Sequence, residues 1–117
     1  MKYLLMCCAD ETLWAQLPES ERGRLMGEYG QLLHELKTSG RLLGSAQLDR
    51  SARAVTVRKK NGKPLITDGP FAETREQLGG YHLIECADRD EAVSIALRFP
   101  TLAAGCSIEV RPFLRLD

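Results

Sequence analysis

The sequence predicts an α+β domain with a ferredoxin-like βαβ-βαβ order into which a β-hairpin is inserted. Three observations predict this fold. Residues 2–9 read as a strand, residues 18–39 carry the apolar spacing of a helix, and Asn61-Gly62 separates two further strand-like segments as a tight hairpin turn. The 117 residues suit one domain, which we expect to span residues 1–117.

The first strand is apolar on both faces. Because side chains alternate along a strand, Tyr3 and Leu5 point to one face, and Leu4 and Met6 to the other. Both faces of the sheet should therefore be covered. The two helices expected in this chain can cover only one face of a four-stranded antiparallel sheet. We therefore expect a homodimer in which two sheets pack face to face.

The long helix is expected over residues 18–39, with Pro18 in its first turn and Gly40 as its C-terminal stop. Gly23 and Gly27 weaken its first half. Two reasons for these glycines remain open: the helix packs closely on the sheet, or it breaks late. The inward stripe of the helix consists of Leu25, Tyr29, Leu32 and Leu36.

The remaining elements follow in order along the chain. Asp88 and Glu91 form an Asp-x-x-Glu start for the second helix, which should end before Pro100. Pro112 indicates that the last strand lies at an edge or carries a bulge. We also expect a helical turn at 73–77 and strands at 41–47, 54–59, 63–67, 80–86 and 107–115.

The composition excludes several classes of function. Sixteen basic residues balance sixteen acidic ones, so no global field draws the chain to nucleic acid or to an anionic membrane. No apolar run approaches a membrane span, and the N-terminal run is too short for a signal peptide, so we expect a cytoplasmic location. A basic patch around the hairpin lacks aromatic residues and is interpreted as solvated; it consists of Arg50, Arg53, Arg58, Lys59, Lys60 and Lys63.

The sequence predicts neither a metal site nor a cofactor. No two cysteines have Cys-x-x-Cys spacing, and neither histidine lies near them. There is no Gly-x-Gly-x-x-Gly or Walker pattern, and Gly79-Gly80 favours a close backbone approach over phosphate binding. We expect reduced, buried thiols at Cys7, Cys8, Cys86 and Cys106.

Residues 67–81 form a compact polar loop between two apolar runs, which is where small domains usually place their function. Its segment 67–80, which includes Asp68-Gly69-Pro70-Phe71, resembles the signature of the DGPF branch of the YCII-related family. Residues 1–6 and 108–112 are similar to the first and last strands of that family.

This resemblance implies a ferredoxin-like fold that dimerises as an α/β barrel. Most DGPF proteins have no assigned activity, and many are associated with extracytoplasmic-function sigma factors. A wider YCII-like relative is a dehydrochlorinase that uses a His-Asp pair. His34 lies within the long helix, and His82 stands where the branch usually has an aromatic residue. The sequence therefore offers no clear counterpart to the histidine of that pair.

Asp68 is the first candidate for a catalytic residue. In a cleft it can act as a general base, especially if burial raises its pKa. The alternative is an Asx-type turn ahead of Gly69-Pro70. The candidates for ligand contact in the same loop are Phe71, Glu73, Arg75 and Glu76. Their charged members could equally lie on a short solvated helix.

Three further residues lie outside the loop. His82 either titrates near neutral pH within the site or is a hydrogen-bonded packing residue. Arg111 shares a strand face with Glu109, so it either clamps a ligand carboxylate or pairs with Glu109. Trp14 caps either the core or the mouth of the cleft.

Two functional hypotheses follow. The first is a small-molecule pocket beside the Asp68 loop for an organic, anionic or aromatic ligand. If the pocket is catalytic, Asp68 moves a proton in a cofactor-independent elimination or isomerisation, and Arg75 or Arg111 stabilises the developing negative charge. The second is a non-catalytic partner or sensor of a sigma factor or other regulator, with the loop as its docking surface.

Overall fold

The computed structural model describes residues 1–115, so the last two residues of the expected domain lie outside the description. The main sheet is antiparallel, with the strand order β2-β5-β1-β6. Its strands are β1 (Lys2–Ala9), β2 (Leu42–Gln47), β5 (Gln77–Glu85) and β6 (Ser107–Pro112). This order, with the helices between the strands, is that of the ferredoxin-like fold. The predicted fold class is confirmed.

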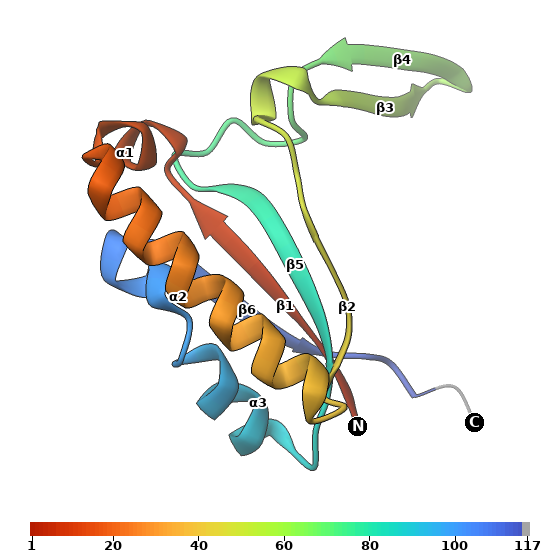
Figure 1. The fold of residues 1–117 in the computed structure, drawn as a ribbon. Coiled ribbons are helices and arrows are strands. Elements are labelled where there is room, and N and C mark those ends of the chain that lie inside the picture. Colours follow the sequence, from red (N-terminus) through yellow and green to blue (C-terminus); the bar gives the residue numbers. More distant parts are fainter. Residues whose placement is uncertain (116–117) are drawn as a thin grey trace.

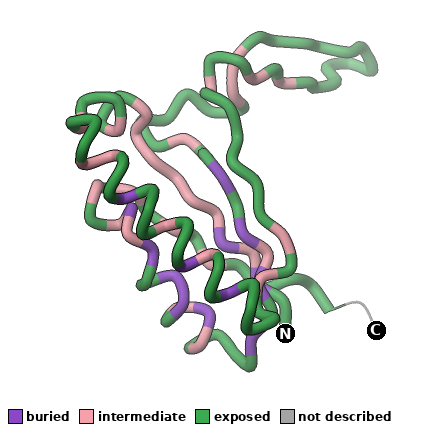
Figure 2. Tube along the Cα trace, in the orientation of Figure 1, coloured by how far each residue is buried: buried purple, intermediate pink, exposed green. Residues whose placement is uncertain are grey.

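Two helices, α2 (Glu19–Thr38) and α3 (Arg89–Ala96), cover one face of this sheet (Figure 1). Buried residues gather at the end of the sheet where α3 packs, and burial falls off toward the N-terminal half of α2 (Figure 2). The core consists of Tyr3, Leu5, Leu32, Leu36, Ile84, Cys86, Ala92, Ile95, Ala96 and Phe99. The asymmetry leaves the other end of the sheet open to line a cavity.

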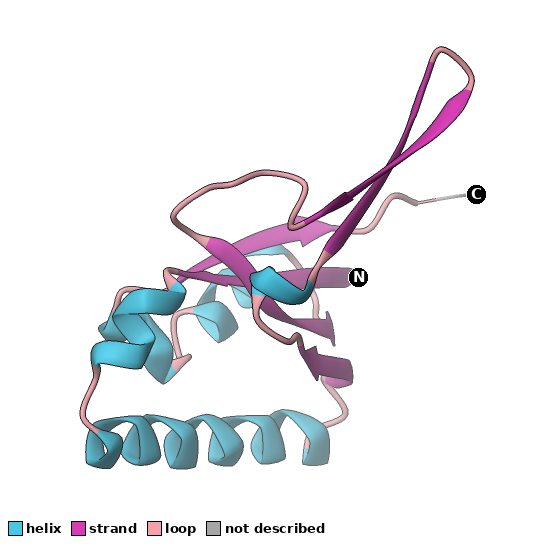
Figure 3. Cartoon of the chain, turned by 90° about the horizontal axis from the view of Figure 1, so that it is seen from above, coloured by secondary structure: helices cyan, strands magenta, loops and turns pink. Residues whose placement is uncertain are grey.

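The opposite face of the sheet carries apolar side chains without a covering layer. Tyr3 and Leu5 are buried under the helices, whereas Leu4, Met6 and Leu83 are half-buried on the other face. Within residues 1–115, no helix packs on that second face (Figure 3).

The predicted hairpin is present as a separate two-stranded sheet, β3 (Val55–Lys60) and β4 (Lys63–Asp68), which projects away from the body (Figure 3). Asn61 and Gly62 have φ values of 53° and 77°, as a type I′ hairpin turn requires. Val57 pairs with Ile66 and Val55 with Asp68, so Val55, Val57 and Ile66 form an apolar strip on the face of the hairpin that also carries Asp68.

Helix α2 is continuous, so the late break proposed for its glycines is wrong. Close packing is wrong as well, because a Cβ at Gly23 or Gly27 would meet nothing within 4 Å. No contact in the structure explains these two glycines. Pro18 is the residue before the first turn rather than part of it. In contrast, the predicted start of α3 is confirmed, since the Asp88 carboxylate accepts from the Glu91 N–H at 2.9 Å.

The loop and two element ends differ from the prediction. The helical turn expected at 73–77 is wrong: this segment bends, and β5 begins at Gln77. The Gln77 side-chain amide donates to the carbonyls of Ala72 and Thr74, both at 2.9 Å, and thereby closes the loop without helical bonds. The last strand ends at Pro112 rather than at 115. Within the described part of the chain it is an edge strand paired with β1 alone, which begins at Lys2 and offers no backbone partner beyond Phe113.

A short helix, α1 (Glu11–Gln16), was not predicted. Asp10 caps it by accepting from the Thr12 N–H at 2.9 Å. Two short 3₁₀ segments, η1 (Ser51–Arg53) and η2 (Pro100–Ala104), complete the described elements. None of the helices described is long and apolar enough to cross a membrane.

The Gly79-Gly80 pair allows the close backbone approach that was predicted. A Cβ at Gly80 would lie 3.0 Å from the Ala46 carbonyl oxygen of the neighbouring strand β2. Glycine therefore lets β2 and β5 approach each other at the edge of the cavity.

Candidate functional site

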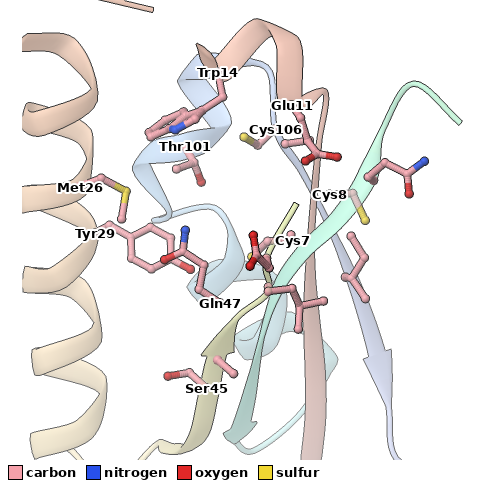
Figure 4. Close-up of a pocket in the computed structure, with 18 of the residues that line it drawn as sticks. Cys7, Cys8, Glu11, Trp14, Met26, Tyr29, Ser45, Gln47, Thr101 and Cys106 are labelled. Carbon is pink, nitrogen blue, oxygen red and sulfur yellow. The ribbon is translucent and has the colours of Figure 1, made fainter. Parts of the chain in front are cut away.

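A cavity of about 710 Å³ lies between α2, which lines it from Arg22 to Leu33, and the end of the sheet that α3 leaves uncovered. In Figure 4, Met26 and Tyr29 project into it from α2, Trp14 lies on α1, and the strands form the opposite wall. The cavity is mostly apolar. Its deep wall is formed by the side chains of Cys7, Tyr29, His82, Thr101 and Cys106.

The central polar contact of this wall joins two distant parts of the chain. The Tyr29 hydroxyl, from α2, hydrogen-bonds Nε2 of His82, from β5. The imidazole stacks on Phe99 with ring centroids 5.0 Å apart and planes at 29°. Tyr29 meets the same Phe99 ring edge-on at 5.4 Å. Because Phe99 is buried, this packing fixes the orientation of both polar rings.

Burial keeps this pair uncharged. His82 is only 2% exposed, and the loss of hydration lowers its pKa to about 4. The imidazole is therefore neutral at neutral pH. Burial also raises the pKa of the Tyr29 hydroxyl, with a further contribution from the neighbouring Cys7. Among residues 1–115, Nδ1 of His82 has no hydrogen-bond partner.

The thiols beside the pair are also uncharged. Burial raises the pKa of Cys7 to about 11, although a hydrogen bond with Tyr29 acts in the opposite direction. Burial likewise raises the pKa of Cys106, partly offset by a hydrogen bond with Thr101. The nucleophilic form of cysteine is the thiolate. These thiols therefore act as neutral polar groups at neutral pH. The cysteines of the described chain are free, as predicted, but the predicted burial holds for Cys86 and is wrong for Cys7, Cys8 and Cys106, which are half-buried.

Charged residues line the cavity where it opens to solvent. Arg22 is half-buried and donates to the Ala15 carbonyl at 3.3 Å, while Asp49 and Arg50 are exposed. Glu11 accepts hydrogen bonds from the backbone N–H of Ser51 at 3.2 Å and from its hydroxyl. Of these four charged residues, none is fully buried, and the two that are half-buried, Glu11 and Arg22, are hydrogen-bonded.

A second, more open cavity adjoins the first. Glu11 and Gln77 line both, and the remaining walls of the second include Gly69, Pro70 and Arg75. The polar loop singled out from the sequence therefore lies beside the mouth of the main cavity. The positive charge of Arg75 contributes to lowering the pKa of Asp10, for which the hydrogen bond from Thr12 is the larger cause.

The structure distributes the predicted site residues unevenly. His82 alone lines the main cavity, whereas Glu73 and Arg75 line the second. The residues that line neither cavity are Asp68, Phe71, Glu76 and Arg111. Phe71 is 78% exposed and lies under the Arg58 guanidinium, 5.1 Å from ring centroid to Cζ. Arg111 pairs with Glu109 at 2.6 Å on the exposed edge strand.

Asp68 lies exposed at the end of β4. In the described chain its carboxylate accepts no hydrogen bond, and the Gly69 N–H donates to the Ala54 carbonyl at 2.7 Å instead. The Asx-turn alternative is therefore wrong. The catalytic role of Asp68 stays a prediction.

A comparison with known protein families identifies the family of this chain. The YCII-related domain matches residues 1–114. The chain belongs to the YCII-related family. An uncharacterised protein of Rhizobium meliloti (strain 1021) is 37% identical to it over 114 residues, which is 96% of this chain and 91% of the relative. The family resemblance is confirmed, and the DGPF branch within it stays a prediction.

Among solved structures, this YCII-related chain is similar to the 5-chloro-2-hydroxyhydroquinone dehydrochlorinase TftG from Burkholderia phenoliruptrix AC1100, in complex with 2,5-dihydroxybenzoquinone. The TM-score is 0.49 and the sequence identity 16%, and the match covers 97% of this chain and 94% of the other.

Tyr29, Cys7 and Cys106 line the cavity and were not predicted to do so from the sequence. Tyr29 falls on the inward stripe of a helix, where an aromatic residue usually indicates core packing. It meets His82 across 53 residues of sequence, so no local spacing signals the pair. The two thiols lie in apolar segments that predict burial and nothing more.

Proposed function

We propose that this protein binds a small organic molecule in the cavity between α2 and the sheet. The observation that carries the proposal is the hydrogen-bonded pair of half-buried Tyr29 and buried His82 in a mostly apolar cavity. Ligand sites are typically concave and apolar with a few convergent polar groups, and volumes of about 300–1,000 Å³ are usual for them. The cavity of about 710 Å³ falls in that range.

The chemistry proposed for this site is a cofactor-independent proton transfer of the lyase or isomerase kind. Tyr29 supplies a polarising hydrogen bond to the reacting group, and the neutral imidazole of His82 supports the phenol oxygen. Asp68 remains our proposed base. Because it lies on a hairpin that projects from the body, it would act on the cavity of a second copy of the chain. Arg75 is proposed to stabilise negative charge near the mouth.

The uncovered face of the sheet supports a homodimer. Leu4, Met6 and Leu83 form the centre of that face, and pairing two such faces would remove them from water. Light scattering after gel filtration measures the assembly directly. We expect a dimeric mass for the wild type and a monomeric mass for Met6→Asp. A monomeric wild type at micromolar concentration would contradict the proposal.

A second candidate function is docking to a regulatory protein such as a sigma factor. It is favoured by the projecting hairpin, on which Val55, Val57 and Ile66 are 56%, 69% and 67% exposed on one face. We expect Val57→Asp to abolish co-purification with a co-expressed sigma factor if this surface is used. Equal co-purification of wild type and Val57→Asp would rule the hairpin out.

A thermal-shift screen of a metabolite library tests the binding proposal, with two glycines of α2 as a matched pair. Gly30 lines the cavity and Gly27 does not, and a Cβ at either position meets nothing within 4 Å. Gly30→Phe should therefore fill the cavity, whereas Gly27→Phe adds the same side chain elsewhere on the same helix. We expect ligands to stabilise the wild type and Gly27→Phe, and not Gly30→Phe.

Two results would contradict the proposal. Equal shifts in all three proteins would place the ligand outside this cavity. The absence of any shift, from a folded protein and a broad library, would favour the regulatory-partner candidate.

A further inference from the structure

The proposed cavity contains a polar atom whose partner is missing, and this atom constrains what the ligand must be. Nδ1 of His82 is buried without a hydrogen-bond partner in residues 1–115, while Nε2 of the same ring meets the Tyr29 hydroxyl. A neutral imidazole carries one proton, on either nitrogen. The position of that proton decides which way the Tyr29 hydroxyl points.

The two tautomers differ in what they leave unpaired. With the proton on Nδ1, a buried N–H would have no acceptor. With the proton on Nε2, the N–H donates to the Tyr29 oxygen, and only a lone pair on Nδ1 is left unused. Unpaired buried N–H groups are rarer in proteins than underused acceptors. The structure therefore favours the tautomer with the proton on Nε2.

In this tautomer the hydroxyl proton of Tyr29 is not used in the hydrogen bond with His82. Since its oxygen accepts from His82, the phenol O–H must donate to another group. Cys7 is a neighbour of this hydroxyl, because each of the two groups shifts the pKa of the other, and sulfur is a weak acceptor. Both side chains line the cavity (Figure 4). An oxygen atom of a ligand would accept this proton in place of the sulfur.

The neighbouring groups set the charge of that ligand. The deep wall consists of Tyr29, His82, Thr101 and the two thiols, all of which are uncharged at neutral pH. Of the charged lining residues, Asp49 and Arg50 are exposed, and half-buried Glu11 and Arg22 are already hydrogen-bonded. A carboxylate or an ammonium group at the deep wall would lose hydration without gaining an ion partner. A carbonyl oxygen carries no net charge, so it would need no ion partner at this wall.

We propose that the cavity recognises an uncharged, largely apolar molecule by a carbonyl oxygen, which accepts a hydrogen bond from Tyr29 while His82 donates from Nε2 to the tyrosine oxygen. This inference rests on the proposed function, because it names the ligand class of the same cavity. Of the ligands expected from the sequence, it excludes the anionic one and specifies the other as a neutral, largely apolar carbonyl compound.

The tautomer is tested first and without a ligand. Nitrogen-15 NMR of labelled protein distinguishes a protonated ring nitrogen from an unprotonated one, and His82→Gln identifies the signals. We expect a protonated Nε2 and an unprotonated Nδ1 at neutral pH. A protonated Nδ1 would overturn the inference and leave the binding proposal standing.

Three probes of similar shape test the ligand class: 2-acetylnaphthalene, 2-naphthoate and 2-ethylnaphthalene. Trp14 is the single tryptophan of the chain and lines the cavity, so its indole N–H signal in NMR reports occupancy. We expect the ketone to bind most tightly. Tyr29→Phe keeps the ring that packs on Phe99 and removes only the hydroxyl. It should weaken ketone binding about five- to tenfold, as one neutral hydrogen bond predicts, and leave the hydrocarbon unchanged.

The possible failures are distinguishable. If the ketone and the hydrocarbon bind equally and Tyr29→Phe alters neither, the carbonyl inference is wrong and the cavity proposal survives. Tighter binding of the naphthoate than of the ketone would also overturn the inference. If none of the three shifts the Trp14 signal up to its solubility limit, both the inference and the cavity proposal fail.

Discussion

The Tyr29 hydroxyl and the His82 imidazole meet where the packed core of this protein gives way to its cavity. One side of the pair rests on Phe99, which is buried in the core, and the other faces the open volume. The core therefore fixes the geometry of two polar groups that the cavity leaves available. This is the arrangement by which a rigid scaffold positions a binding site.

The lowered pKa of His82 predicts a dependence of stability on pH. The unfolded chain takes up a proton on this residue near pH 6.5, whereas the folded protein does so only near about 4. The contribution of the neutral form is therefore fully present above pH 6.5 and is lost as the pH falls toward 4. We expect a loss of about 2–3 kcal/mol in the free energy of unfolding between pH 7 and about pH 4.5.

Urea denaturation at both pH values measures this loss. His82→Gln is the matched control, because its amide can still bond Tyr29 and does not titrate. The carboxylates titrate in both proteins. Subtracting the pH-dependent change in the free energy of unfolding of His82→Gln from that of the wild type therefore leaves the contribution of His82. Identical pH dependence in wild type and His82→Gln would show that His82 is not buried in its neutral form.

The raised pKa of Cys7 predicts slow alkylation. With a pKa of about 11, the thiolate is a very small fraction at neutral pH. We expect iodoacetamide to label Cys7 at least about tenfold more slowly than N-acetylcysteine at pH 7.5, measured by peptide mass spectrometry. Tyr29→Phe removes the hydrogen bond that lowers this pKa, so labelling should not accelerate. Labelling as fast as that of the free thiol would contradict the buried environment of Cys7.

Two glycine substitutions should change stability in opposite directions. An alanine Cβ at Gly80 would lie 3.0 Å from a backbone carbonyl oxygen, so Gly80→Ala should lower the free energy of unfolding by about 1–3 kcal/mol. Gly27 lies in the middle of α2 with open space around it, so Gly27→Ala should raise it by about 0.5–1 kcal/mol. Chemical denaturation compares the two. If Gly80→Ala leaves the free energy of unfolding unchanged, β2 and β5 do not approach each other as closely as the structure shows.

Asp68→Asn separates binding from catalysis. Asp68 lines neither cavity of its own chain, so we expect any ligand found in the thermal-shift screen to stabilise Asp68→Asn as much as the wild type. If Asp68 is the base supplied by a second copy, turnover of that ligand should fall at least about 100-fold, the usual size of a general-base contribution. Loss of the thermal shift in Asp68→Asn would show that Asp68 is needed for ligand binding, and would contradict this separation.

Particular residues show why the fold could be predicted from the sequence. The alternation of Tyr3, Leu4 and Leu5, the helical stripe and the Asn61-Gly62 turn are local patterns, and each gave the correct element. The short helix α1 had a local signal too, since Asp10 stands at its N-cap. The prediction of a helical turn at 73–77 was wrong because a single side chain, Gln77, closes that loop.

The candidate site was harder to predict from the sequence than the fold. The loop with the strongest family resemblance lies beside the mouth of the cavity, and the polar pair within the cavity comes from elsewhere. Tyr29 and His82 meet only because β5 lies beneath α2 in the fold. The missing partner of Nδ1 is a property of packing, which no spacing of residues reveals.

The most direct test of the central claim is a crystal structure of the protein with the compound that stabilises it most in the thermal-shift screen. We predict density for that compound between Trp14, Met26 and the strands, with an oxygen atom within hydrogen-bond distance of the Tyr29 hydroxyl. Density confined to the open face of the sheet or to the cavity beside residues 69–75, with the main cavity empty, would contradict it.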